Sequence, residues 1–109
     1  MIELDKLDKI FVKQKEYEMM LNLQHSQEER IKSISMAIHA EASELLNTTS
    51  WKWWKKRHQW NPEFAFEELV DILHFIISGC LALDKNSENL FEEYLKKNQI
   101  NRNRQNEGY

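Results

Sequence analysis

The chain has 109 residues, of which 30% are charged and 41% hydrophobic, with only 2 glycines and 1 proline. This composition predicts one mostly helical domain covering residues 1–109. The formal net charge of -3 excludes a general nucleic-acid-binding surface, and the single cysteine excludes an internal disulfide.

The N-terminal residues lack the apolar stretch of a signal peptide, and no run is apolar and long enough to span a membrane. Cys80 lies in an apolar run, which indicates a core residue in a reducing compartment. We therefore expect a cytoplasmic protein that has neither a membrane nor a nucleic acid as partner.

Apolar residues recur at helical intervals and predict four helices, over about 3–25, 28–47, 63–84 and 88–103. Ser26 is a candidate cap for the second helix, and Asn61-Pro62 is a start signal for the third. The third of these is apolar around most of its circumference, which is typical of a helix at the centre of a bundle or at a subunit interface. We therefore expect an all-α bundle of four to five helices, completed by oligomerisation.

Two pairs of acids occur inside apolar helical runs. Glu41 and Glu44 belong to the second helix and Glu68 and Asp71 to the third, each pair at a spacing of three. Residues three apart share a helix face, and charges among apolar residues are expensive to bury without compensation. They are either surface acids or ligands of a hard cation such as Mg²⁺, whose bound water is a nucleophile suited to phosphate ester or anhydride hydrolysis.

The segment between the second and third helices holds all 4 tryptophans, interleaved with basic residues. We expect Trp51 and Trp60 to pack over the bundle. The adjacent Trp53 and Trp54 cannot both point inward, so one of them is a candidate to stack on a flat ligand. Lys52, beside them, is a candidate phosphate contact.

Two further polar groups allow both a structural and a functional interpretation. His74 lies three residues after Asp71, so it is either a core histidine bonded to a carbonyl or a group that donates to a base carbonyl or orients Asp71. Lys97, Asn101 and Arg104 are spaced four and then three, so they share one helix face. They form either a basic helix end favoured by the helix dipole or a triphosphate clamp with arginine as the bidentate group.

These motifs together resemble the dimeric all-α dUTPases within the MazG-like nucleotide pyrophosphatases. The wider group carries E-x-x-E followed by E-x-x-D, as residues 41–44 and 68–71 do. Three longer stretches are similar to the dUTPase branch: E-L-L-x4-W-K-W-W-K at 44–55, the metal-binding helix and its histidine at 68–75, and K-N-x2-N-x2-R-Q-x2-G-Y at 97–109. A short L-Q match at 23–24 is similar to the first-helix glutamine that contacts uracil.

The resemblance implies Mg²⁺-dependent hydrolysis of dUTP to dUMP and pyrophosphate in a homodimer or higher oligomer, with dUDP as a candidate second substrate. It implies a role in sanitation of the nucleotide pool. The four acids would bind metal, with Glu44 and Glu41 catalytic and Glu44 positioning or deprotonating the attacking water. The other implied site residues are Gln24, Trp53 and His74 for the base, and Lys52, Lys97, Asn101, Arg104 and Tyr109 for the sugar and phosphates.

The chain departs from fuller family members in lacking their long insertion, since only a short stretch separates Gly79 from Tyr94. We expect either reduced closure over the substrate or help from a neighbouring chain. Three alternatives stay open: a related enzyme for dCTP or a damaged nucleotide, a ferritin-like di-iron bundle based on Asp71-x-x-His74, and a helical nucleotide-binding module without catalysis.

Overall fold

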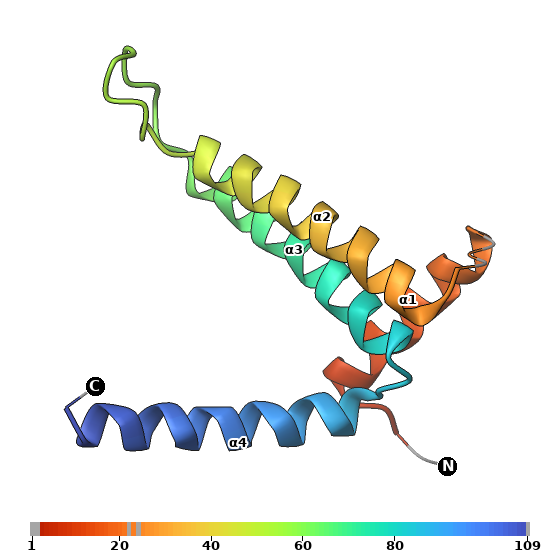
Figure 1. The fold of residues 1–109 in the computed structure, drawn as a ribbon. Helices are drawn as coiled ribbons and strands as arrows, with labels where there is room; N and C mark the ends of the chain where they lie inside the picture. Colours follow the sequence, from red (N-terminus) through yellow and green to blue (C-terminus); the bar gives the residue numbers. More distant parts are fainter. Residues whose placement is uncertain (1–2, 22, 24, 109) are drawn as a thin grey trace.

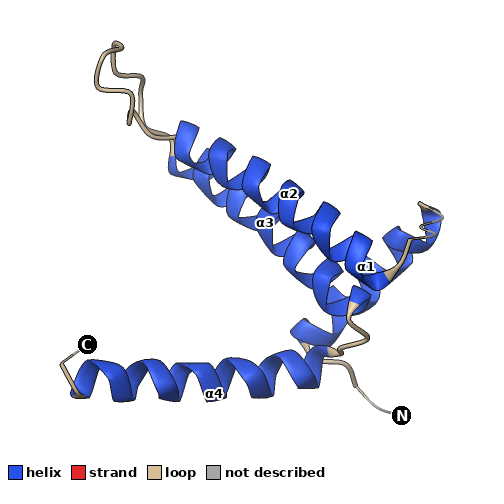
Figure 2. Cartoon of the chain, in the orientation of Figure 1, coloured by secondary structure: helices blue, strands red, loops and turns tan. Residues whose placement is uncertain are grey.

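The computed structural model describes residues 3–21, 23 and 25–108, and it contains four α-helices. No strand occurs in these described ranges, so the predicted all-α class is confirmed (Figure 2). The elements follow one another as α1 (Lys6–Met20), α2 (Gln27–Asn47), α3 (Pro62–Ala82) and α4 (Ser87–Asn106).

The helices begin at residues that supply local capping groups. The Ser26 hydroxyl accepts a hydrogen bond from the Glu29 N–H at 3.2 Å, which caps α2. The Asn61 side chain accepts from the Glu63 N–H at 3.0 Å, and Pro62 occupies the first position of α3. Each cap satisfies a backbone donor that has no partner within its own helix. Both helix starts were visible in the sequence for this reason.

Two helices differ in length from their predicted spans. The α1 helix begins only after Asp5, whose side chain caps it, and it ends at Met20 and not at residue 25. The α4 helix continues to Asn106, past the predicted end at residue 103. Apolar periodicity locates a helix but does not fix the residue at which it ends, so the boundaries are the least predictable part of each element.

The helices α2 and α3 form a long hairpin, and α1 crosses its base (Figure 1). The principal contacts are those of α3 with α2 and with α1. Ile77 of α3 is completely buried, with Phe11 of α1 and Ala82 of α3 as further core residues. Among the described residues the core is therefore small and comes from α1 and α3, and α2 packs against α3.

The fourth helix leaves this core. Beyond its start near α1, α4 runs away from the α2–α3 hairpin, which gives the chain an open outline (Figure 1). The radius of gyration is 17.4 Å, compared with about 13 Å for a compact domain of this length. Large apolar side chains stay exposed on both arms, among them Leu69 (51%), Ile76 (41%), Phe91 (50%) and Tyr94 (66%). One chain therefore does not close the predicted bundle.

In the part of the chain that the structure describes, no helix is both long enough and apolar enough to cross a membrane.

Candidate metal and nucleotide site

The α2–α3 hairpin brings three of the four predicted acids together. Glu41 and Glu44 on α2 and Glu68 on α3 each place one carboxylate oxygen within 4.8 Å of the others. The spacing of three aligns the two glutamates of α2 on one side, and hairpin packing supplies the third acid from the facing helix. This convergence is the tertiary arrangement that the two sequence pairs require if they are to act as one site.

The electrostatics of this acid cluster favour a bound cation. Glu41 Oε2 and Glu68 Oε2 are shielded from solvent. When both carboxyls are ionised, neither oxygen has a hydrogen-bond partner among the described residues; a proton on one carboxyl allows it to donate to the other. A hydrogen bond with Glu41, followed by desolvation and the charges of Glu44, Glu41 and Asp71, raises the pKa of Glu68 to about 7. Carboxylates that repel one another retain a proton unless a cation compensates them. An all-oxygen donor set with two unpaired buried oxygens fits a hard divalent ion such as Mg²⁺.

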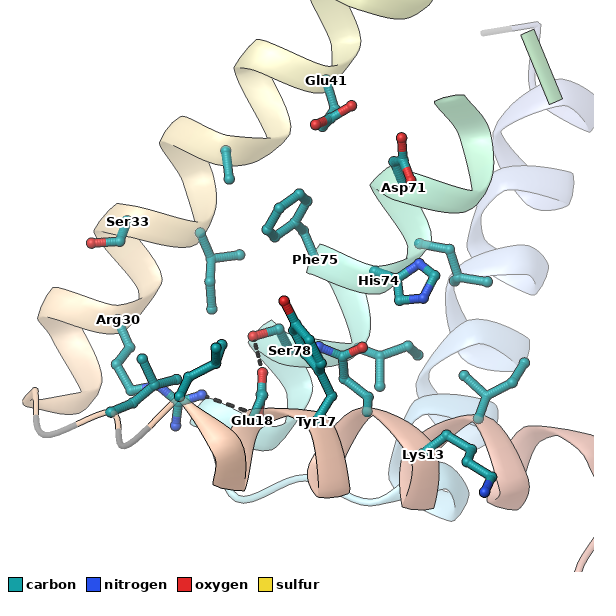
Figure 3. Close-up of a pocket in the computed structure, with 18 of the residues that line it drawn as sticks. Lys13, Tyr17, Glu18, Arg30, Ser33, Glu41, Asp71, His74, Phe75 and Ser78 are labelled. Carbon is teal, nitrogen blue, oxygen red and sulfur yellow. Dashed lines mark hydrogen bonds and ion pairs between the residues drawn. The ribbon is translucent and has the colours of Figure 1, made fainter. Parts of the chain in front are cut away.

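The fourth acid, Asp71, lies next to the cluster and not inside it. Its carboxylate is exposed, and its charge still contributes to the raised pKa of Glu68. Figure 3 shows Asp71 opposite Glu41, the two side chains projecting from α3 and α2 toward the same space. The structure thus places Asp71 where a ligand held by the other three acids would meet it, and its metal-binding role stays a prediction.

A cavity of about 910 Å³ extends from these acids between α1, α2 and α3. Glu41 and Asp71 lie at one end, and the ring of Phe75 occupies the middle (Figure 3). Glu18 and Ser78 lie at the far end. Sites of this size, mostly apolar with a few converging polar groups, are typical of small-molecule pockets. The acids therefore offer oxygen ligands for a cation at one end of the cavity, and the rest of the cavity offers space for a flat organic group.

His74 lines this cavity, as the functional interpretation requires. Its Nδ1 lies 2.9 Å from the Val70 carbonyl oxygen, which can only accept, so Nδ1 carries the donated proton. In the neutral ring, Nε2 is then an acceptor. His74 is thus bonded to a carbonyl, but it is an exposed residue of the cavity lining and not a core residue, and its role toward a bound base stays a prediction.

Several cavity residues were missed by the sequence analysis. Gln14 on α1 is only 9% exposed and lines the cavity, together with Tyr17 and Glu18 of the same helix. The available signal was a polar residue three positions after the buried Phe11, on the inner face of α1. The glutamine assigned to the base from sequence, Gln24, lies outside the described residues.

The tryptophan segment lies away from the cavity. It projects beyond the ends of α2 and α3 (Figure 1), and Trp53 is 85% exposed. Trp51 and Trp60 are 41% and 54% exposed, so the expectation that they pack over the bundle is wrong. The Trp54 ring instead meets the rings of Trp51 and Trp53 edge-on, at 5.8 and 4.6 Å between ring centroids. Lys52 lies near the Trp51 ring, 5.8 Å from its centroid.

The predicted phosphate clamp is likewise separate from the acids in one chain. Lys97, Asn101 and Arg104 are exposed on α4, whose principal contacts are with α1. Tyr109 lies outside the described residues. The chain alone therefore brings together the acids, His74 and the cavity, but not Trp53, Lys52 or the α4 residues, whose assigned roles stay predictions.

Comparison with known proteins places this arrangement in a family. The chain is 38% identical over 71 residues to the dCTP pyrophosphatase of Enterobacteria phage T4, covering 54% of this chain and 42% of the phage protein. It is 37% identical over 71 residues to the dCTP pyrophosphatase of Enterobacteria phage LZ5, covering 54% and 41%. The chain thus spans about two fifths of the length of these curated relatives. No solved structure matches it.

A family profile described as dUTPase matches residues 6–90. This range includes α1, α2 and α3, and hence both acid pairs and the cavity between them. Because the match covers most of the chain and all of its candidate metal site, the protein belongs to the all-α dUTPase family.

Proposed function

We propose that this protein hydrolyses a pyrimidine deoxynucleoside triphosphate to the monophosphate and pyrophosphate, with Mg²⁺ held by Glu41, Glu44, Glu68 and Asp71. The proposal rests on the convergence of three carboxylates, two of them with buried unpaired oxygens, at the end of a cavity of about 910 Å³. The family match supports the same reaction class.

The different exposure of the acids favours a different role for each. When bound, Mg²⁺ supplies stabilisation of the phosphate charge and lowers the pKa of an attached water. Glu41 and Glu68 are half-buried and hold their oxygens toward one another, which suits permanent metal ligands. Glu44 is the exposed member of the cluster, so it is the one that can orient a water from solvent and accept its proton.

Two pyrimidine substrates have specific support. The motifs at residues 44–55 and 97–109 resemble the dUTPase branch and favour dUTP, with a role in sanitation of the nucleotide pool. The two phage relatives are named dCTP pyrophosphatases, which favours dCTP. The bases differ at one ring edge only, so the same metal site serves either substrate.

The rival classes have less support. A di-iron centre built on Asp71-x-x-His74 needs histidine among the ligands, whereas the acid cluster found in the described residues contains carboxylates alone, and His74 Nδ1 is bonded to Val70. A non-catalytic module does not require three acids to converge at the end of a cavity. The geometry therefore favours the hydrolase.

We also infer a homodimer. One chain leaves apolar side chains exposed on α3 and α4, and it keeps Lys97 and Arg104 apart from the acids. A second copy that covers these surfaces would bury them and place basic side chains near the phosphates. The missing insertion gives the same expectation, because a short chain has less of its own surface with which to close the site.

The test is pyrophosphate release in the presence of Mg²⁺ from dUTP, dCTP, dTTP and UTP in parallel. Wild-type protein is compared with Glu44→Gln and with Glu67→Gln, an exposed α3 residue outside the acid cluster. We expect turnover of a deoxypyrimidine triphosphate, a fall in kcat of roughly 100-fold or more for Glu44→Gln, and near-normal turnover for Glu67→Gln. Folded protein that releases pyrophosphate from none of the four contradicts the proposed function, and full activity of Glu44→Gln removes the catalytic assignment.

A further inference from the structure

The end of the cavity opposite the acids contains a polar cluster formed by all three helices of the core. The Ser78 hydroxyl on α3 donates to Glu18 Oε1 on α1, and Arg30 Nη2 on α2 lies 3.4 Å from Glu18 Oε2 (Figure 3). The Glu18 side chain is only 11% exposed and that of Arg30 21%. A carboxylate is thus held by two hydrogen bonds at one end of an otherwise mostly apolar pocket, with its charge balanced by the guanidinium.

The position of this cluster matches that of a base in a bound nucleotide. Seven residues of α3 separate Asp71 from Ser78, which is about 10 Å along the helix axis, roughly the length of a nucleoside. Phe75 lies between them and turns its ring into the cavity, where it can face a planar base (Figure 3). A triphosphate at the acid cluster therefore directs its base past Phe75 toward Glu18.

The carboxylate of Glu18 retains acceptor capacity for such a base. An ionised carboxylate offers about four acceptor positions, and the hydroxyl of Ser78 and the guanidinium of Arg30 use two. In a pyrimidine nucleotide the exocyclic group at C4 is opposite the sugar-bearing nitrogen, so it is the group that enters the pocket first. Cytosine carries an amino donor there, whereas uracil and thymine carry a carbonyl acceptor.

We propose that Glu18, oriented by Ser78 and Arg30, accepts a hydrogen bond from the 4-amino group of cytosine and makes dCTP the preferred substrate. Uracil would set its O4 lone pairs against the carboxylate and leave a buried acceptor without a donor. The proposal rests on the proposed function, because it identifies which triphosphate that site takes. A single carboxylate-to-amino contact discriminates roughly tenfold to hundredfold between bases.

The competing explanation is that Glu18 only ties α1 to α2 and α3. A structural tie predicts that its loss weakens turnover of every substrate alike, since the pocket as a whole would loosen. A base-reading role predicts instead that the ratio of kcat/KM for dCTP to that for dUTP changes. The ratio therefore separates the two explanations where activity alone does not.

The experiment compares kcat/KM for dCTP and dUTP in wild type, Glu18→Gln and Glu16→Gln. Glu16 lies on the same helix, is exposed and is absent from the cavity lining, so it controls for loss of an α1 carboxylate. Because a glutamine amide can donate to O4 of uracil, we expect the dCTP to dUTP ratio of Glu18→Gln to fall roughly tenfold or more. The Glu16→Gln ratio should equal that of wild type.

Two results would overturn the proposal: a wild-type preference for dUTP, or a dCTP to dUTP ratio that Glu18→Gln leaves unchanged, whether or not the variant loses activity toward both substrates. If Glu18→Gln does not fold, the wild-type enzyme decides the question with the 2-pyrimidinone deoxynucleoside triphosphate, which lacks the 4-amino group. We expect its kcat/KM to be lower than that of dCTP by the same factor, and equal values would refute the contact.

Binding of dCMP and dUMP to wild type and Glu18→Gln separates this proposal from the proposed function. If no triphosphate is hydrolysed but wild type binds dCMP more tightly and the variant loses that preference, the hydrolase proposal fails and the base-reading role stands. If triphosphates are hydrolysed and the two monophosphates bind equally, the base-reading role fails and the hydrolase proposal stands.

Discussion

The helices α2, α3 and α4 are similar in length, with 21, 21 and 20 residues. The α2–α3 hairpin finds its packing partners within one chain, whereas α4 largely does not. The hairpin, with α1 across its base, buries Ile77 fully and positions three acids around one point. The α4 helix has a capping box at Asn86 and Asn89, but none of its described side chains is buried. Local sequence signals therefore suffice to form all three helices, but only the two helices of the hairpin also pack extensively within the same chain.

This difference separates two parts of the proposed chemistry. The candidate metal site and the cavity lie within α1, α2 and α3, so one chain can organise them. The basic residues of α4 reach phosphate only if another surface brings them there. In the proposed reaction, folding of one chain would position the acids, whereas assembly of two chains would be needed to bring the basic residues of α4 to the phosphates.

The largest expected difference between the core and α4 is in the free energy of unfolding, when one residue of each is replaced by alanine. Ile77→Ala removes a fully buried side chain, and we expect it to lower the free energy of unfolding by about 2–5 kcal/mol. Tyr94→Ala removes a ring that is 66% exposed on α4, and in dilute protein it should change that free energy by less than about 0.5 kcal/mol. Urea unfolding at several protein concentrations measures both values.

Concentration dependence gives the control. If α4 forms part of an interface, the effect of Tyr94→Ala should grow with protein concentration, because association adds to stability by mass action. A large effect of Tyr94→Ala in dilute monomer would contradict the contrast, since it would mean that α4 packs against the hairpin of its own chain in solution.

The phosphate role of α4 predicts an intermediate effect on substrate affinity. Removing one cation from a charge-assisted hydrogen bond costs about 1.5–3 kcal/mol, so Lys97→Ala should raise KM roughly tenfold or more. Lys96→Ala removes the same charge from a neighbouring face of α4, about 100° away, and should leave KM nearly unchanged. Steady-state kinetics of the two variants provide the measurement, and equal KM values would place α4 away from the substrate.

The acid cluster predicts a smaller effect, which depends on pH. The pKa of Glu68 is raised from 4.5 to about 7 in the folded chain, so the folded state binds this proton more tightly than the unfolded state. The resulting stabilisation is fully present below pH 4.5 and is lost as the pH rises through about 7. Without metal, we expect this contribution to lower the melting temperature across that interval.

Two controls assign this pH dependence to the cluster. Glu68→Gln, which cannot ionise, should flatten it, and Mg²⁺ should raise the melting temperature more at high pH than at low pH because the ion displaces the proton. Thermal unfolding across pH with and without Mg²⁺ tests both expectations. A metal-free protein whose Glu68→Gln variant has the wild-type pH dependence would show that Glu68 is not the group responsible.

Much of the fold was readable from local sequence. Apolar periodicity located all four helices, and Ser26 and Asn61 marked the starts of α2 and α3 because a cap is a contact between residues two or three apart. The convergence of Glu41 with Glu68 also followed, since two acid pairs on neighbouring antiparallel helices have one shared side on which to meet. Such inferences need helix geometry and little else.

The cavity end was not readable in this way. Glu18 and Ser78 are sixty residues apart, and nothing local relates a glutamate of α1 to a serine of α3. The same limit explains the error over Trp51 and Trp60: their apolar character suggested burial, whereas the segment that carries them projects beyond the hairpin. An apolar side chain favours burial, but the path of the chain decides whether a surface that could bury it lies close enough.

The sequence by itself determined the helices, their class and the pairing of acids, because each depends on periodicity or on contacts within about one helical turn. Tertiary structure alone decided that Asp71 lies beside the point that Glu41, Glu44 and Glu68 share, and that Gln14, Glu18 and Ser78 line one cavity. It also decided that α4 leaves the core. The physical reason is that long-range packing depends on which faces meet in space, and one helix does not encode the face of another.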